Sequence, residues 1–150
     1  MNNHLFFQSI SMLTKYLSCI MFFTLSACQV ESSNTFFNFI KLTVDLKVNP
    51  TAIENNIPKF SWEVDVQGFN KSQSAYQILV ASSIDKLNEK EADLWNSGKK
   101  PSDRSVFIPY AGDTLQAIHT YFWKVKIWDE KGNASSWSDV NRFSMGLMGQ

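Results

Sequence analysis

The sequence predicts an all-β fold, an antiparallel two-sheet β-sandwich of about seven short strands. Its dominant hydrophobic period is two, which is the period of half-buried strands. The apolar runs are short, and turns rich in Gly, Pro, Asn and Asp separate them. We expect one domain over residues 40–147, which is an ordinary size for a single domain.

The first two strands show the alternation most clearly. Apolar residues at every second position predict one strand over 42–48 and another over 60–66. The alternating residues are Leu42, Val44, Leu46 and Val48, followed by Phe60, Trp62, Val64 and Val66. Asn49, Pro50 and Pro58 mark the loop between the two strands.

The remaining strands follow in order. Tyr76, Ile78 and Val80 define one face of a third strand, and Leu79 and Ala81 make its other face apolar, as expected of a central strand. Residues 84–90 are expected to form a short helical turn. Further strands are expected at 94–95, 106–108, 121–128 and 143–145. In the strand at 121–128 the inward positions are Tyr121, Trp123, Val125 and Ile127.

Leu115 and Tyr121 stand six residues apart just before this long strand. The spacing resembles a tyrosine corner, in which the Tyr hydroxyl bonds back to upstream backbone in fibronectin type III and related sandwiches. The alternative is an ordinary aromatic strand residue. The positions of Trp62, Gly132 and Trp137 favour the corner, and with it a fibronectin type III/immunoglobulin-like sandwich.

Several spaced motifs carry a more specific resemblance over Leu42 to Leu147. They are Pro58–Trp62, Asp93–Lys99, Ile108–Gly112, Tyr121–Glu130, Trp137–Ser138 and Phe143–Leu147. In this order they resemble the N-terminal β-sandwich module of bacterial α-L-rhamnosidases, which are glycoside hydrolases. The resemblance implies a non-catalytic module, because the acids of that family lie in a separate helical barrel downstream. Residues 148–150 would then be a truncated linker toward the next domain.

The N-terminus predicts export. Lys15 precedes a short apolar run that ends in Leu25-Ser26-Ala27-Cys28, so residues 1–28 read as a lipoprotein signal peptide with a lipobox. Cys28 would be lipidated and would anchor the chain to a membrane. Gln29 after the cysteine indicates an outer-membrane lipoprotein of a Gram-negative bacterium, on the periplasmic or the surface side. The alternatives are an ordinary signal peptide with an incidental cysteine, or an uncleaved anchor.

Residues 29–39 form a polar stretch without periodicity and are expected to be a tether. The two cysteines, Cys19 and Cys28, both fall before it, so neither a disulfide nor a zinc site is expected in the domain. The formal net charge is zero, which argues against nucleic acid as a partner.

Catalytic chemistry has little support in the sequence. The two histidines, His4 and His119, lie far apart, with the first in the leader. The acidic clusters are Glu89, Glu91 and Asp93, and then Asp129 and Glu130. Both read as turns or solvated charges rather than as the paired acids of a glycosidase, since neither has an apolar setting to raise a pKa. No catalytic, cofactor or metal residue is therefore expected.

The outward positions of the long strand are the remaining candidates for a site. They are Phe122, Lys124, Lys126 and Trp128, with Leu79 as a possible neighbour. We expect a docking face for a neighbouring domain or subunit. The alternatives are surface aromatics half-covered by lysine stems, or a platform that binds a rhamnose-containing glycan.

These observations predict a lipid-anchored accessory module, structural or docking in role, whose partners are downstream rhamnosidase domains or a neighbouring subunit. Two alternatives stay open. The chain is a fragment of an active α-L-rhamnosidase that removes terminal rhamnose from glycans, or it is a surface glycan-binding lipoprotein.

Overall fold

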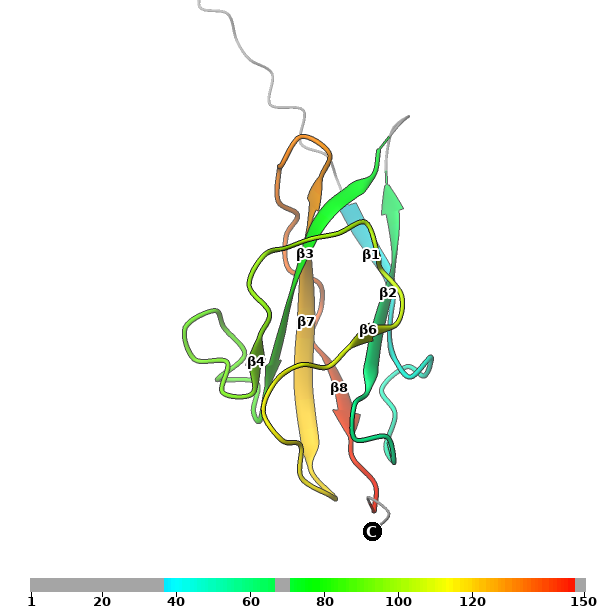
Figure 1. Ribbon diagram of the computed structural model, residues 1–150, viewed down its shortest axis with the longest axis vertical. Coiled ribbons are helices and arrows are strands. Elements are labelled where there is room, and N and C mark those ends of the chain that lie inside the picture. Colours follow the sequence, from blue (N-terminus) through cyan, green and yellow to red (C-terminus); the bar gives the residue numbers. More distant parts are fainter. Residues whose placement is uncertain (1–36, 67–70, 148–150) are drawn as a thin grey trace, which may run out of the picture. The chain divides into compact units, whose positions relative to one another are not determined.

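The computed structural model describes residues 37–66 and 71–147, and every regular element in these ranges is a β-strand. The strands are β1 (Phe37–Val44), β2 (Lys59–Val66), β3 (Gln73–Ala81), β4 (Trp95–Asn96), β5 (Lys100–Pro101), β6 (Ile108–Pro109), β7 (Thr120–Asp129) and β8 (Asn141–Ser144). They form two antiparallel sheets, as predicted (Figure 1).

The smaller sheet has the order β1-β2-β6, and the larger has the order β4-β3-β7-β8, with β5 also paired to β3. The longest pairing joins β3 to β7, from Gln73 opposite Asp129 to Ala81 opposite Phe122. Figure 1 shows these two strands side by side, with β1 and β2 in the other layer. The central position predicted for the strand around Ile78 is thus confirmed.

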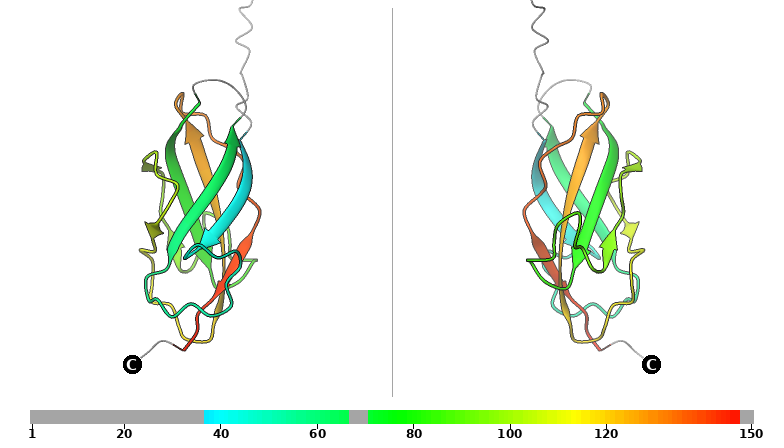
Figure 2. Two further views of the ribbon diagram at one scale, coloured as in Figure 1. Left: turned by 90° about the vertical axis from the view of Figure 1, so that its right-hand side faces the viewer. Right: turned by 90° about the vertical axis from the view of Figure 1, so that its left-hand side faces the viewer.

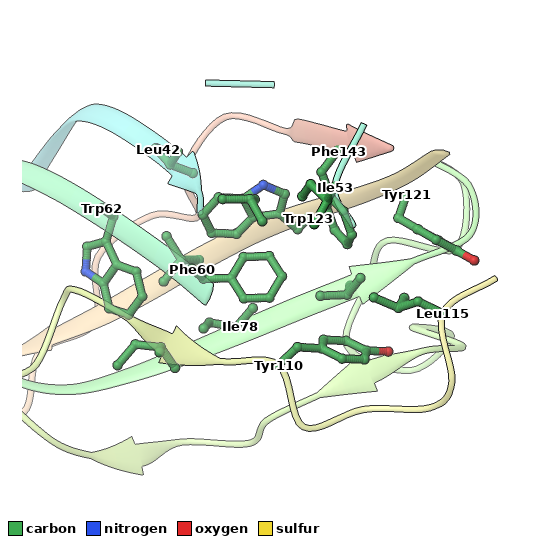
Figure 3. Close-up of a cluster of buried hydrophobic side chains, with 14 of the residues drawn as sticks. Leu42, Ile53, Phe60, Trp62, Ile78, Tyr110, Leu115, Tyr121, Trp123 and Phe143 are labelled. Carbon is green, nitrogen blue, oxygen red and sulfur yellow. The ribbon is translucent and has the colours of Figure 1, made fainter. Parts of the chain in front are cut away.

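The core lies between the two sheets (Figure 3). Trp62 and Phe60 enter it from β2, and Trp123 enters it from β7, with the Phe60 and Trp123 ring centroids 4.7 Å apart. Alternate residues of β7 are buried from Tyr121 to Ile127, as the period of two predicted. Burial of these large side chains supplies most of the driving force for folding, since no disulfide is available to the domain.

The first strand differs from the prediction at both ends. It begins at Phe37, inside the segment expected to be a tether, and it ends at Val44 rather than at residue 48. Asp45 and Leu46 have φ values of 47° and 64°, and Val44 and Lys47 exchange backbone hydrogen bonds to close a tight turn. The continued alternation through Leu46 and Val48 was misleading, because both side chains are exposed.

The segment 84–90 also differs from the prediction. It forms successive turns, one of them closed by the bond from Leu87 N–H to the Ile84 carbonyl, rather than the single helical turn expected. Two features that period-two reasoning did not indicate are the short strand β5 and the bulge in β1 between Phe39 and Lys41.

Residues 34–150 form a compact unit of their own, which contains the whole core. The predicted signal peptide, the lipobox with Cys28 and most of the predicted tether lie outside the described residues. Within the described ranges no helix is long and apolar enough to cross a bilayer.

Candidate functional site

The tyrosine corner is formed as the sequence predicted. The backbone N–H of Gln116 donates to the Tyr121 hydroxyl at 2.8 Å, and Leu115 is buried in the core beside it. The segment 110–119 carries the chain from one sheet to the other, and this bond ties it to Tyr121, the second residue of β7. This contact fixes the start of the strand whose outer face is the predicted docking surface.

That outer face is not open. Leu79 is fully buried, so it cannot belong to an exposed surface, contrary to the prediction. It forms a second small core with Ala81 and Leu87, and Phe122, Ala92 and Trp137 pack against this cluster. The cause is the excursion between β3 and β4, which folds back over the sheet and covers the residues that parity places outside.

Trp137 is held over the same face by two serines. Ser135 and Ser138 each accept a hydrogen bond from β7 through the hydroxyl oxygen, from the N–H of Ile127 and of Val125, both at 3.1 Å. Their own N–H groups donate back to the carbonyls of the same two residues at 2.8 Å. Because both serines are fixed, Trp137 between them has a defined position beside the lysines of β7.

The lysines of β7 cover the aromatic rings. Lys126 Nζ lies 4.5 Å from the ring centroid of Trp137 and 5.2 Å from that of Trp128, and Lys124 Nζ lies 5.0 Å from Trp137. Lys99 lies over Trp128 at 4.7 Å. This arrangement is a cation–π ladder, in which lysine stems and charges occupy faces that a sugar ring would otherwise stack on.

The ladder ends in an ion pair. Lys126 Nζ donates to Glu89 Oε1 at 2.6 Å, and this hydrogen bond and charge lower the pKa of Glu89. Burial lowers the pKa of Lys124, an effect that the nearby Glu89 carboxylate partly opposes. Four of the five residues expected on this face, Phe122, Lys124, Lys126 and Trp128, are thus half-buried in contacts within the domain.

Carboxylates of the acidic clusters form hydrogen bonds and ion pairs that hold loop segments in place. Asp93 accepts bonds from Ser82 N–H, Ser82 Oγ and Lys86 Nζ; burial opposes its ionisation, but these bonds together lower its pKa to about 2. Glu130 pairs with Lys71 at 3.1 Å, and its pKa is lowered by backbone hydrogen bonding and by that lysine. A catalytic acid needs a raised pKa, so neither carboxylate has that character.

Asp129 is fully buried and closes the turn after β7. Its carboxylate accepts bonds from the N–H groups of Lys131 and Asn133 and from the Asn133 side chain.

His119 is exposed, and its Nδ1 lies 3.0 Å from the Ala117 carbonyl. Among the residues that the structure describes, no three His, Cys, Asp or Glu side chains gather in a way that could hold a metal ion.

Gln73 is a positioning residue that the sequence did not reveal. Its side chain accepts the indole N–H of Trp62 at 3.0 Å and donates to the carbonyls of Ser102 and Arg104 at 3.0 and 2.8 Å. It therefore joins the core tryptophan of one sheet to a strand of the other and to the loop before β6. A lone glutamine at a strand start gives no sequence signal for this role.

The two antiparallel sheets, the shared core and the tyrosine corner define this protein as a β-sandwich domain of the immunoglobulin and fibronectin type III class. Residues 39–149 match the family described as the Rha78A-like, N-terminal immunoglobulin domain. The chain belongs to this family.

Its relatives are much longer proteins. An α-L-rhamnosidase of Formosa agariphila is 48% identical over 126 residues, which are 84% of this chain and 13% of that protein. A second α-L-rhamnosidase of the same organism is 39% identical over 132 residues, and one from Streptomyces avermitilis is 41% identical over 107. In each case the chain spans only a small part of the relative.

Solved structures agree with this family. The S. avermitilis α-L-rhamnosidase complexed with L-rhamnose matches with a TM-score of 0.71 and 39% identity, over 75% of this chain and 11% of that one. The α-L-rhamnosidase from Dictyoglumus thermophilum matches with a TM-score of 0.71 and 38% identity, over 75% of this chain and 12% of that one.

Proposed function

We propose that this chain is the non-catalytic N-terminal module of an exported α-L-rhamnosidase, structural or docking in role. The observation that carries the proposal is the family match over 39–149 together with 48% identity to an α-L-rhamnosidase. Hydrolysis of terminal rhamnose is proposed for the longer protein, with the module contributing stability or position rather than reacting groups.

The chemistry of the described residues supports a non-catalytic role for the module. Its clustered carboxylates cap turns or pair with lysines, and their pKa values are lowered where they are shifted. A glycosidase needs one carboxyl held protonated near the scissile bond and a second one ionised across it. We therefore expect residues 34–150 alone to release no rhamnose from an aryl α-L-rhamnoside above the rate of a heat-inactivated sample.

A chimera tests the function directly. Residues 37–149 would replace the matching module in the 48% identical F. agariphila enzyme, with deletion of the module as the control. We expect the chimera to be soluble and to hydrolyse an aryl α-L-rhamnoside at a rate comparable to the parent, and the deletion variant to be less stable. A chimera no better than the deletion variant would contradict the proposal.

We also propose that the chain is a lipoprotein anchored through Cys28. The support is the sequence Leu25-Ser26-Ala27-Cys28 after a short apolar run. Several acyl chains hold a protein at a membrane far better than one, which suits a stable anchor. Replacing Cys28 by Ser should leave the protein unprocessed or release it from membranes. Processing and membrane association identical to those of the parent would rule the anchor out.

A further inference from the structure

Three segments meet at one end of the sandwich, and we call their surface the Leu147 end. They are residues 50–58, residues 114–120 and residues 143–147. Gly146 N–H donates to the Ile53 carbonyl at 2.8 Å, and Met145 N–H donates to the His119 carbonyl at 2.9 Å, so all three segments are joined. Figure 2 shows their loops together at the end where the last described residues lie.

The Leu147 end is apolar and exposed. Ile57, Ile118 and Leu147 are 55%, 73% and 76% exposed, yet the three segments contain only two ionisable side chains, Glu54 and His119. The opposite end of β7 is charged, since Glu130 and Lys131 follow that strand directly and Glu130 pairs with Lys71. Depletion of charge and enrichment in large apolar side chains is the composition of an interface core.

Ile118 is also strained. Its φ is +59°, a left-handed conformation that a β-branched residue rarely adopts. A loop that only had to turn would favour Asn or Gly at this position. Instead the chain combines an unfavourable backbone with a large apolar side chain in solvent, and both are unfavourable for the domain alone. Leu46 also has a positive φ and an exposed apolar side chain, in the tight turn after β1, but Ile118 is β-branched and is therefore the stronger outlier. Strained residues of this kind cluster at functional sites.

We propose that the Leu147 end docks on the domain that follows this module in the longer α-L-rhamnosidases. The inference rests on the proposed function and names the surface and the partner. The family is an N-terminal domain, so in its members the polypeptide continues beyond the position of residue 149. Leu147 lies directly before that point, and the Ile118 N–H lies 3.4 Å from the carbonyl of the neighbouring Gly146.

The lengths of the relatives also favour the following domain as the occupant of the Leu147 end. The F. agariphila relatives contain this module in only 13% and 14% of their length, so a large remainder is available to cover the surface. The outer face of β7, by contrast, is already occupied by Leu87, Ala92 and Trp137 of the domain itself. The end of the sandwich thus replaces the strand face as the docking surface.

The test compares Ile118→Asn with Ile84→Asn in two contexts, the unit 34–150 and the chimera with the F. agariphila enzyme. Ile84 is the matched control, because it is similarly exposed, at 59%, but lies in the segment between β3 and β4. In the unit alone, Ile118→Asn should keep or raise the melting temperature, because Asn accepts a positive φ more readily.

In the chimera the same substitution should have the opposite effect. Ile118→Asn and Leu147→Ser should lower the melting temperature by several degrees and should accelerate release of the module by limited proteolysis several-fold, whereas Ile84→Asn should do neither. Equal behaviour of Ile118→Asn and Ile84→Asn in the chimera would overturn the proposal.

A second outcome would also overturn it. If the unit 34–150 dimerises at micromolar concentration and Ile118→Asn makes it monomeric, a second copy rather than the next domain covers this surface. Failure of the unsubstituted chimera to fold would instead count against the proposed function. The two proposals can therefore fail separately.

Discussion

Trp62 donates its indole N–H to Oε1 of Gln73 at 3.0 Å, across the interface between the two sheets. The other large core indole, that of Trp123, is equally buried, but its N–H has no acceptor among the described residues. Two tryptophans of the same core thus differ in one hydrogen bond. An unpaired buried donor is costly, whereas removal of both partners of a bond can be nearly neutral.

Conservative substitution should separate the two sites. Trp62→Phe removes the donor and leaves Gln73 Oε1 without its partner, whereas Trp123→Phe removes a donor that has none. Both lose similar apolar volume, so we expect Trp62→Phe to lower the free energy of unfolding by about 1 kcal/mol more than Trp123→Phe. Urea denaturation of the two variants measures the difference, and equal values would show that Gln73 contributes no net stability through this bond.

Complete truncation should be far more severe at either position. Trp62 and Trp123 are both almost fully buried on facing sheets, as their parity in the sequence predicted. Replacement by Ala should cost about 3 to 5 kcal/mol, which approaches the whole stability of a small domain. Loss of the cooperative thermal transition is the expected result. A soluble, cooperatively melting Trp123→Ala variant would contradict the assignment of this residue to the core.

The hydroxyl oxygen of Tyr121 in the tyrosine corner should make a measurable contribution to the free energy of unfolding. Tyr121→Phe leaves the Gln116 N–H without its 2.8 Å acceptor in a partly buried setting. We expect a loss of about 1 to 2 kcal/mol in the free energy of unfolding. Tyr76→Phe is the control, because the Tyr76 ring packs at a tilt against Trp62 but lies outside the corner. If both variants lose the same free energy of unfolding, the hydrogen bond of the corner contributes no net stability.

Gly112 is required by a close approach. A Cβ built at this position would lie 2.3 Å from the Leu94 carbonyl oxygen and 2.6 Å from Trp95 Cβ, and neither can move freely. Gly112→Ala should therefore destabilise the domain by about 1 to 3 kcal/mol. Gly146→Ala is the matched control, since its nearest contacts lie at an ordinary 3.5 Å. Melting temperatures that fall equally in both variants would exclude the proposed clash.

Acid should weaken the segment between β3 and β4 through Asp93. The folded-state pKa of Asp93 is lowered from 3.8 to about 2, so its contribution is complete above pH 4 and disappears as the pH falls through about 2. Asp93→Asn should lower the free energy of unfolding at neutral pH. It should also make that free energy fall less steeply as the pH decreases from 4 to about 2. Denaturation midpoints at a series of pH values measure this, and an unchanged slope in the variant would contradict it.

The sequence predicted those parts of the fold that follow from local alternation. The parity of β7, the central position of β3 and the bond at Tyr121 depend on short-range patterns, and all three are confirmed. The end of β1 could not be predicted in this way, because Leu46 continues the period while the backbone reverses.

The candidate site could not be predicted from local patterns, because it depends on contacts between residues that are distant in sequence. Parity placed Leu79 and Phe122 outside their sheet correctly, but it could not show that Leu87 and Trp137 would cover them. The same limit applies to the Leu147 end, where three segments far apart in the chain combine. Neither the strain at Ile118 nor its proximity to Gly146 has a signature in the sequence.

The bonds from Ser135 and Ser138 to β7 have a consequence for solubility. Strand β8 pairs with β7 only as far as Trp123, which would leave the later N–H and C=O groups of a long strand open to another chain. The two serines occupy these groups at Val125 and Ile127. An exposed edge of this length is a template for intermolecular β-pairing. The segment with Ser135 and Ser138 should therefore reduce aggregation by covering this edge.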